Sequence, residues 1–232
     1  MDARSYLTKV GLSLDVTAVR EAQQALWSVL EEAKKQSLPA TPSALNALYQ
    51  YRVPKLSDDG SCSLHEELDP KPYDLSEALG GRSVQTSFSL LTIDALIESA
   101  QQRLGCEWLG AYQLRARPGG PALVKLAYRG AESRAEFPMT DDFAARSNNV
   151  AVGRSGTARI INDVGAHLAQ GGAYYECDPK VQSEACLPVL DANGKVVGII
   201  DAEATQRGFF TPERLAALVA LATELPSHFP RT

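Results

Sequence analysis

Apolar residues recur at helical spacing in three long segments of the chain. The segments cover residues 17–36, 84–104 and 212–225. In each of them apolar side chains return every three or four positions, as they do on one face of an amphipathic helix. Thr211 is a favourable residue just before a helix, and Gly105 is favourable just after one. The pattern therefore predicts three helices, each with one buried face.

Alternating positions and short apolar runs predict four strands in the second half of the chain. Residues 106–115 and 122–128 form one pair, joined by a Pro- and Gly-rich turn. Residues 185–190 and 196–200 form a second pair around Asn193-Gly194, a dipeptide typical of a two-residue type I′ turn. The predicted elements follow the order helix, strand pair, loop-rich middle, strand pair and helix. This order is typical of an α+β fold. We expect an antiparallel sheet with helices packed on one face and a ligand pocket on the other, under the middle loops.

The first 82 residues form a separate part of the predicted organisation. A helix over 17–36 and a shorter one over 42–51 precede a Pro-, Gly-, Asp- and Ser-rich connection over 52–82. We therefore divide the chain into an N-terminal helical extension with an irregular linker, residues 1–82, and a main domain, residues 83–232. The extension is expected to pack on the main domain or on a second subunit.

Composition and charge narrow the classes of function. The 232 residues are 44% apolar and carry 28 acidic and 23 basic side chains, for a net charge of −5. No basic run suggests a nucleic-acid partner, and no apolar run is long enough for a membrane span. The start of the chain does not resemble a signal peptide, so we expect a cytoplasmic protein with its four cysteines as free thiols. Its three histidines have no paired spacing, so no structural zinc site is expected and no residue is assigned as a metal ligand.

The second strand pair places acidic side chains on one face. A two-residue loop puts Leu190 opposite Val197, Cys186 opposite Asp201 and Glu184 opposite Glu203. These side chains share a face because residues alternate across a strand. Facing carboxylates repel each other, so their grouping suggests a function. They could hold an ammonium group or a metal such as Mg²⁺, or stay protonated and donate a proton; alternatively, some of them point to solvent.

Other side chains allow both a structural and a chemical interpretation. Trp108 and Tyr112 lie on one strand face together with Cys106, and they fill the core or enclose a small apolar or cationic group. Cys177 lies in a polar segment between Glu176 and Asp178. These acidic neighbours disfavour its thiolate, so Cys177 is inert unless a nearby cation or a helix N-terminus compensates.

Several short motifs together resemble the GAF domain, and within it the free methionine-(R)-sulfoxide reductases. Residues 107–112, Glu-Trp-Leu-Gly-Ala-Tyr, match that family's Trp-x-Gly-x-Tyr strand. Residues 153–158, Gly-Arg-Ser-Gly-Thr-Ala, match its glycine turn in part, and residues 198–203, Gly-Ile-Ile-Asp-Ala-Glu, match its last strand. The resemblance covers residues 84–225 and implies a GAF-like fold.

The resemblance also implies a site and a reaction. Trp108, Tyr112, Glu184, Asp201 and Glu203 would hold free methionine sulfoxide, with the carboxylates on its ammonium group and helping to protonate the sulfoxide oxygen. Cys177 would be the nucleophile, becoming a sulfenic acid as methionine leaves. No cofactor is implied beyond an external thiol reductant such as thioredoxin. Homodimer formation is expected by the same analogy.

The chain departs from this family in its cysteines. Ser155 stands at one family cysteine, a second is missing between Cys106 and Cys177, and Glu203 replaces an aspartate. Cys186 and Cys106 are then the candidates for a resolving thiol, unless a small thiol reduces Cys177 directly. The alternative function is a non-enzymatic GAF sensor module that binds an amino-acid-like ligand, with the N-terminal helices forming a dimer or relaying a signal.

Overall fold

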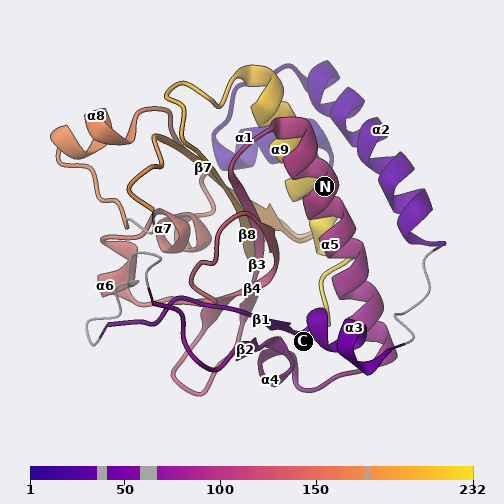
Figure 1. Cartoon of the computed structure of the whole chain (residues 1–232). Helices are drawn as coiled ribbons and strands as arrows, with labels where there is room; N and C mark the ends of the chain where they lie inside the picture. Colours follow the sequence, from indigo (N-terminus) through magenta and orange to yellow (C-terminus); the bar gives the residue numbers. More distant parts are fainter. Residues whose placement is uncertain (36–40, 58–66, 176–177, 232) are drawn as a thin grey trace.

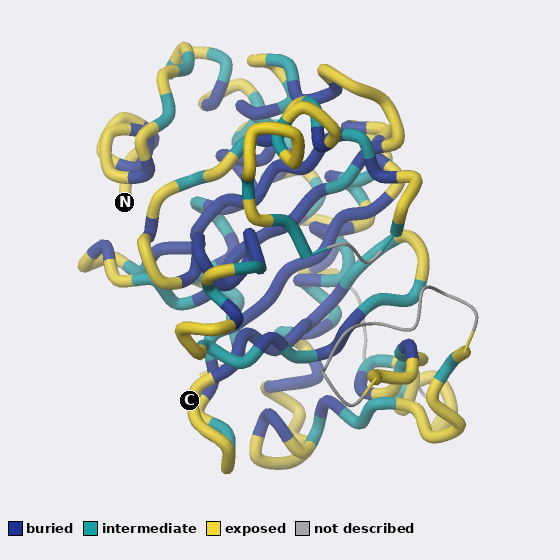
Figure 2. Tube along the Cα trace, turned by 90° about the vertical axis from the view of Figure 1, so that its left-hand side faces the viewer, coloured by how far each residue is buried: buried dark blue, intermediate teal, exposed yellow. Residues whose placement is uncertain are grey.

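A six-stranded antiparallel sheet lies at the centre of the structure, a computed structural model that describes residues 1–35, 41–57, 67–175 and 178–231 (Figure 1). The strand order is β5-β4-β3-β8-β7-β6. The strands are β3 (Trp108–Arg115), β4 (Ala122–Arg129), β5 (Glu136–Pro138), β6 (Arg159–Ile161), β7 (Ser183–Leu190) and β8 (Val196–Ala204). Figure 2 shows these strands as the buried centre of the chain, with the exposed residues mainly in the surrounding loops and helices. The predicted α+β fold is confirmed.

Long helices lie on one side of this sheet. Helices α5 (Val84–Leu104) and α9 (Pro212–Glu224) pack on its strands, and α2 (Val16–Ala33) packs on the outer side of these two helices. The short 3-10 helix η1 (Leu225–Ser227) follows α9. Helix α5 begins at a Ser83–Thr86 capping box and ends at Gly105, whose φ of 69° lies in the left-handed region. Among the described residues, no helix combines the length and hydrophobicity that a membrane crossing requires.

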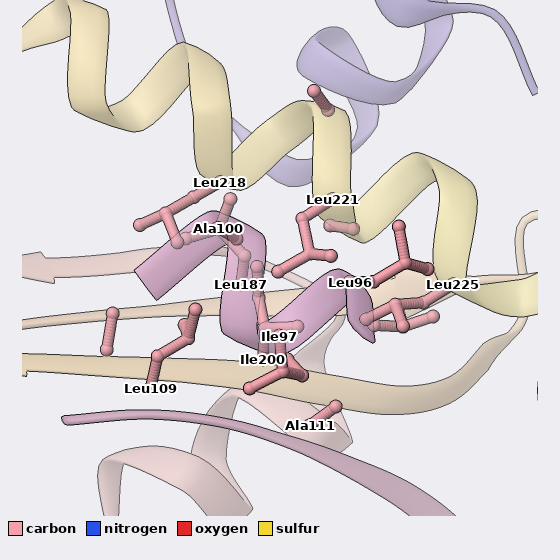
Figure 3. Close-up of a cluster of buried hydrophobic side chains, with 14 of the residues drawn as sticks. Leu96, Ile97, Ala100, Leu109, Ala111, Leu187, Ile200, Leu218, Leu221 and Leu225 are labelled. Atoms are coloured by element: carbon pink, nitrogen blue, oxygen red, sulfur yellow. The ribbon is translucent and has the colours of Figure 1, made fainter. Parts of the chain in front are cut away.

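The main core fills the space between these helices and the sheet. Figure 3 shows the side chains that meet there from α5, α9 and the strands. The labelled residues are Leu96, Ile97, Ala100, Leu109, Ala111, Leu187, Ile200, Leu218, Leu221 and Leu225. They come from the apolar positions of the predicted helices and strands, so the periodicity of the sequence locates this core.

The segment between the two strand pairs covers the opposite face. It was expected to be mostly loop, but it also forms α6 (Asp141–Ala144), α7 (Asn148–Ser155) and α8 (Val164–Ala169). In Figure 1 these helices lie on the left of the sheet, and the long helices lie on its right. Helix α7 packs on β7 and β8. The second face is therefore a separate, smaller interior between the sheet and this segment.

The N-terminal extension packs against the long helices. Its first helix, α1 (Ala3–Val10), was not predicted, and the helix expected over 42–51 ends early as α3 (Pro42–Ala47). The expected linker contributes β2 (Tyr73–Asp74), which pairs with β1 (Gln50–Tyr51), and α4 (Leu75–Leu79). The end of the predicted first helix at position 36, positions 37–40 after it, and positions 58–66 of the predicted linker lie outside the described residues.

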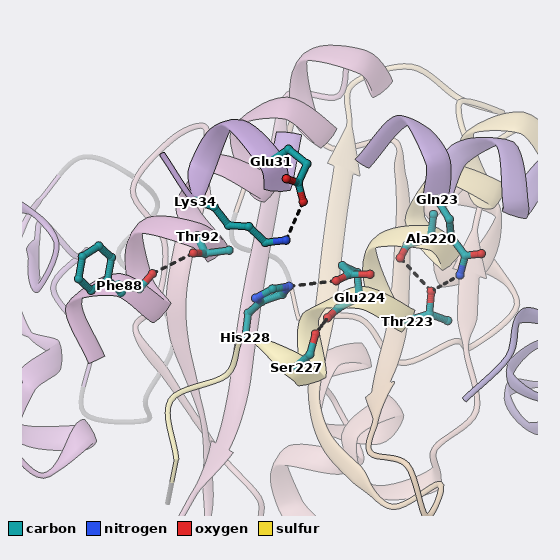
Figure 4. A network of polar contacts seen from close by, with 10 residues as sticks. All are labelled: Gln23, Glu31, Lys34, Phe88, Thr92, Ala220, Thr223, Glu224, Ser227 and His228. Carbon is teal, nitrogen blue, oxygen red and sulfur yellow. Dashed lines mark hydrogen bonds and ion pairs between the residues drawn. The ribbon is translucent and has the colours of Figure 1, made fainter. Parts of the chain in front are cut away.

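Polar contacts join this extension to the main domain. The Tyr6 hydroxyl donates to the Pro188 carbonyl of β7 at 2.6 Å. The Gln23 side chain of α2 donates to the Thr223 hydroxyl of α9 at 2.9 Å (Figure 4). Tyr6 is also buried in the main core. The extension and the main domain thus share one core, although the boundary at 82/83 stays a prediction.

The β7–β8 hairpin has the predicted pairing at its open end and a different loop. Glu184 lies opposite Glu203 and Cys186 opposite Asp201, as expected, but Leu190 lies opposite Val196 and not Val197. The loop is longer than a two-residue turn: Asp191 N donates to the Lys195 carbonyl, and Gly194 has a φ of 76°. A register shift between Val189 and Leu190 compensates for the longer loop.

Candidate functional site

A small cavity lies between the second face of the sheet and the segment that covers it. Its walls are aromatic on one side, with Trp108, Tyr112, Phe137 and Tyr175, and polar on the other. The cavity volume is about 20 Å³, which is enough for one water molecule. A larger ligand would enter only if some of these side chains moved.

Trp108 lies across its own strand because residue 110 is glycine. A Cβ atom at Gly110 would come within 2.3 Å of the Trp108 ring, so no other residue leaves space for the indole. The ring centroids of Trp108 and Tyr112 are 6.2 Å apart, and the indole N–H donates to the Ala131 carbonyl at 3.0 Å. The spacing Trp-x-Gly-x-Tyr thus produces one continuous aromatic wall.

Three carboxylates meet at the polar wall. Single oxygen atoms of Glu184, Asp201 and Glu203 lie within 4.8 Å of one another. Glu184 and Asp201 are only 4% and 3% exposed, and Glu203 is half-buried. Within the described part of the chain, this is the one group of three such side chains close enough to share a cation. The five residues proposed as substrate-binding therefore line one cavity, while the expectation that none of them is a metal ligand stays a prediction.

Burial changes the proton affinity of two of these groups. It raises the pKa of Glu184 to about 7, although a hydrogen bond from Asn148 opposes the rise. Burial and the nearby charges of Glu184 and Glu203 raise the pKa of Asp201 well above its ordinary value. Two buried carboxylates this close cannot both ionise cheaply. At neutral pH the pair therefore retains a proton that it could donate to a ligand.

Two asparagines complete the polar wall, and sequence reasoning missed both. Asn148 Nδ2 donates to Glu184 Oε1 at 2.5 Å, and Asn149 Nδ2 donates to Asp201 Oδ2 at 2.9 Å. They occupy the first turn of α7, whose N-cap is Ser147. Consecutive helix residues point about 100° apart, so one reaches β7 and the other β8. The Ser-Asn-Asn sequence was a possible sign of a helix start in a segment expected to be polar loop.

The two cysteines within the described residues lie on opposite faces of the sheet. Cys186 is buried on the cavity side of the sheet, where burial raises its pKa well above the ordinary value. Cys106 was expected on the Trp108 face, which is wrong: it packs in the main core on the helix side, because β3 begins only at Trp108 and alternation does not extend back to it. Burial raises the pKa of Cys106 to about 12. Cys177, the predicted nucleophile, lies outside the described residues, so its distance from the cavity stays a prediction.

Comparisons with known proteins identify the architecture. A family model described as GAF domain matches residues 92–225. A type II free methionine-R-sulfoxide reductase from Thermoplasma acidophilum has a similar structure, with a TM-score of 0.54 and 20% identity over 62% of this chain and 94% of that one. At this identity the likeness shows the fold alone. No curated protein matches the chain significantly.

Two further solved structures have lower scores. A free methionine-R-sulfoxide reductase from Neisseria meningitidis, in complex with its substrate, has a TM-score of 0.48 and 21% identity over 64% of this chain and 92% of that one. The GAF domain of an Acinetobacter phosphoenolpyruvate-protein phosphotransferase has a TM-score of 0.49 and 13% identity over 66% and 86%.

Proposed function

Because the chain belongs to the GAF domain family, we propose that its cavity binds free methionine sulfoxide and that Cys177 reduces this ligand. The observation that carries the proposal is the meeting of Trp108, Tyr112, Glu184, Asp201 and Glu203 in one cavity. An ammonium group fits the carboxylates, and the methyl-sulfoxide end fits the aromatic wall. The Thermoplasma protein of the same fold bears this activity in its name.

The reaction transfers one oxygen atom from the ligand to the enzyme. The Cys177 sulfur attacks the sulfoxide sulfur while the protonated pair of Glu184 and Asp201 gives a proton to the sulfoxide oxygen. The sulfur–oxygen bond of the ligand and the transient sulfur–sulfur bond break, and the oxygen passes to Cys177 as a sulfenic acid while methionine leaves. The proton of the Cys177 thiol replaces the one that the carboxyl pair gave. Methionine sulfur gains the two electrons that Cys177 loses.

An external thiol closes the cycle. One thiol attacks the sulfenic acid of Cys177, releasing water and forming a mixed disulfide, and a second thiol displaces Cys177 as a free thiol. The burial of Cys186 and Cys106 and their raised pKa values argue against either as the resolving residue. Such a cycle requires a reducing compartment, in agreement with the proposed cytoplasmic location.

Turnover of free methionine-(R)-sulfoxide with dithiothreitol tests this function. We expect the wild type and the control variant Cys106→Ala to release methionine, and Cys177→Ser to bind the sulfoxide without turnover. Binding by the wild type without release of methionine would remove the reductase assignment.

That outcome would support a second candidate, a sensor module that binds an amino-acid-like ligand. The small volume of the cavity and the burial of the Cys106 and Cys186 thiols favour it. A sensor would respond to the ligand with a change in its helices or in its proposed homodimer. Sedimentation of the wild type with and without methionine sulfoxide would report that change.

A further inference from the structure

Three buried oxygen atoms around the cavity have no hydrogen-bond partner within the part of the chain that the structure describes. They are Asn148 Oδ1, Asn149 Oδ1 and Asp201 Oδ1. Their side chains line the same cavity, and the residues are 3%, 7% and 3% exposed. A buried acceptor without a donor costs about 1–3 kcal/mol. Three such acceptors around one cavity indicate a ligand that supplies several hydrogen-bond donors.

The carboxylates determine how the two amide groups are oriented. A carboxyl oxygen that carries no proton only accepts hydrogen bonds, whether or not the other oxygen of the pair is protonated, so each asparagine turns its nitrogen towards such an oxygen. Asn148 does so towards Glu184, and Asn149 towards Asp201. The two amide oxygens are then left without a donor among the described residues, beside the cavity that both asparagines line. Each asparagine can therefore orient a carboxylate and accept a hydrogen bond from a ligand at the same time.

The number of acceptors distinguishes between possible ligand groups. A water molecule has two hydrogens, so it satisfies at most two of the three oxygens. A primary ammonium group has three N–H donors and a positive charge, which suits the carboxylates around it. A dimethylated ammonium keeps only one N–H donor, and a trimethylated one keeps none.

From this match we infer that Asn148 and Asn149, together with Asp201, form a three-acceptor cradle that selects a primary ammonium group. The inference rests on the proposed function, because it names the residues that recognise the amino end of the ligand. Glu203 and the Glu184–Asp201 pair, which shares one proton, supply the surrounding negative charge. Selection then depends on the number of N–H donors as well as on charge.

Binding of a methylation series tests the cradle. The Cys177→Ser variant prevents turnover, and calorimetry gives its affinity for methionine sulfoxide and for the N-methyl and N,N-dimethyl derivatives. We expect affinity to fall about tenfold or more for each lost N–H, the size of a hydrogen bond to a charged group. In the same background, Asn148→Leu with Asn149→Leu should bind all three compounds within about threefold of one another, because the acceptors are gone.

The design separates hydrogen-bond acceptance from crowding and from misfolding. Leucine does not enlarge the cavity, so a preference among the three compounds that came only from crowding would survive in the double variant. The exposed residue Asn193 on the β7–β8 loop provides the matched control Asn193→Ala, which should keep the stepwise loss. The single variants, each expected to weaken one step, replace the double variant if it does not fold.

The pH profile distinguishes an acceptor from a residue that only orients a carboxylate. If the asparagines act only by favouring ionisation of Glu184 and Asp201, raising the pH should restore full affinity to the leucine variants. A lost acceptor keeps their affinity for methionine sulfoxide low at every pH.

The remaining outcomes separate a failure of the cradle from a failure of the proposed function. Equal binding of the three compounds by the Cys177→Ser protein would overturn the cradle while leaving the binding function intact. An unchanged stepwise loss in the leucine double variant would overturn it too. Failure of the Cys177→Ser protein to bind any of the compounds would instead contradict the proposed function itself.

Discussion

Glu184 shows at the level of one residue that this site costs stability. Its pKa rises from 4.5 to about 7 on folding, mainly because of burial. Between these values the folded protein holds a proton that the unfolded chain releases, so stability falls as the pH increases. Above pH 7 the buried negative charge is fully developed. The loss of stability accompanies the proposed function, because a neutral side chain at this position would not attract an ammonium group.

Replacement of Glu184 by glutamine should therefore stabilise the protein while weakening ligand binding. We expect Glu184→Gln to raise the free energy of unfolding at pH 8 by up to about 3 kcal/mol, the equivalent of its pKa change. At pH 5 the gain should nearly disappear, because the folded wild type is then protonated at this position. Urea unfolding at both pH values measures the gain. An equal gain at pH 5 and pH 8 would contradict the raised pKa as its cause.

The place of some residues in the site can be predicted from the sequence, and that of others cannot. Alternation along two strands is enough to group Glu184, Asp201 and Glu203, because neighbours in a hairpin are determined by its register. The contacts of Asn148 and Asn149 cross more than 30 positions and come from a short helix without a clear apolar period. Alternation puts Cys106 on the face opposite to its real one, because the regular strand begins only at Trp108.

At the scale of an element, β3 depends on a missing side chain. The Trp108 ring occupies the space where a Cβ atom of Gly110 would lie. We expect Gly110→Ala to displace the indole and weaken binding of methionine sulfoxide about tenfold, since burial of the methyl end of the ligand against the ring contributes about 1–2 kcal/mol. Calorimetry measures the affinity, and near-ultraviolet circular dichroism reports the indole environment.

Gly119, in the turn after β3, is the matched control for this change. A Cβ atom there would meet no atom within 4 Å, and its φ is not in the left-handed region. The Gly119→Ala variant should thus bind as the wild type does. If Gly110→Ala binds equally well, the indole position does not determine recognition.

In the β7–β8 hairpin the predicted pairing at the open end is correct, but the predicted two-residue turn is not. Asn193-Gly194 indicated a two-residue turn, but the Asp191 carboxylate accepts hydrogen bonds from the backbone of Asn193 and Lys195, both at 2.9 Å. These bonds hold a wider loop. The register shift beside Leu190 then restores the predicted pairing of Glu184 and Cys186. A strand pattern identifies the shared face, whereas such side-chain contacts determine the loop.

At the scale of the whole molecule, the extension is part of the same folding unit as the sheet. Pro188 lies on β7 beyond the residues that pair with β6, which end at Cys186. A proline fits at such an edge because it has no N–H to donate. Its carbonyl accepts the Tyr6 hydroxyl of α1 instead. Helix periodicity could not predict this contact, because it joins positions 182 residues apart.

If the extension and the sheet share one core, they should unfold together. Far-ultraviolet circular dichroism follows the helices, including α1 and α2, and Trp108 fluorescence in a Trp27→Phe background follows the site. We expect the same denaturant midpoint from both probes. The Tyr6→Phe variant loses one buried hydrogen bond and should lower both midpoints together, by about 1 kcal/mol in the free energy of unfolding. Thr8→Ala, on the exposed side of α1, should lower neither appreciably. A Tyr6→Phe protein that loses helical signal before its Trp108 signal changes would show that α1 is only docked on an independently stable domain.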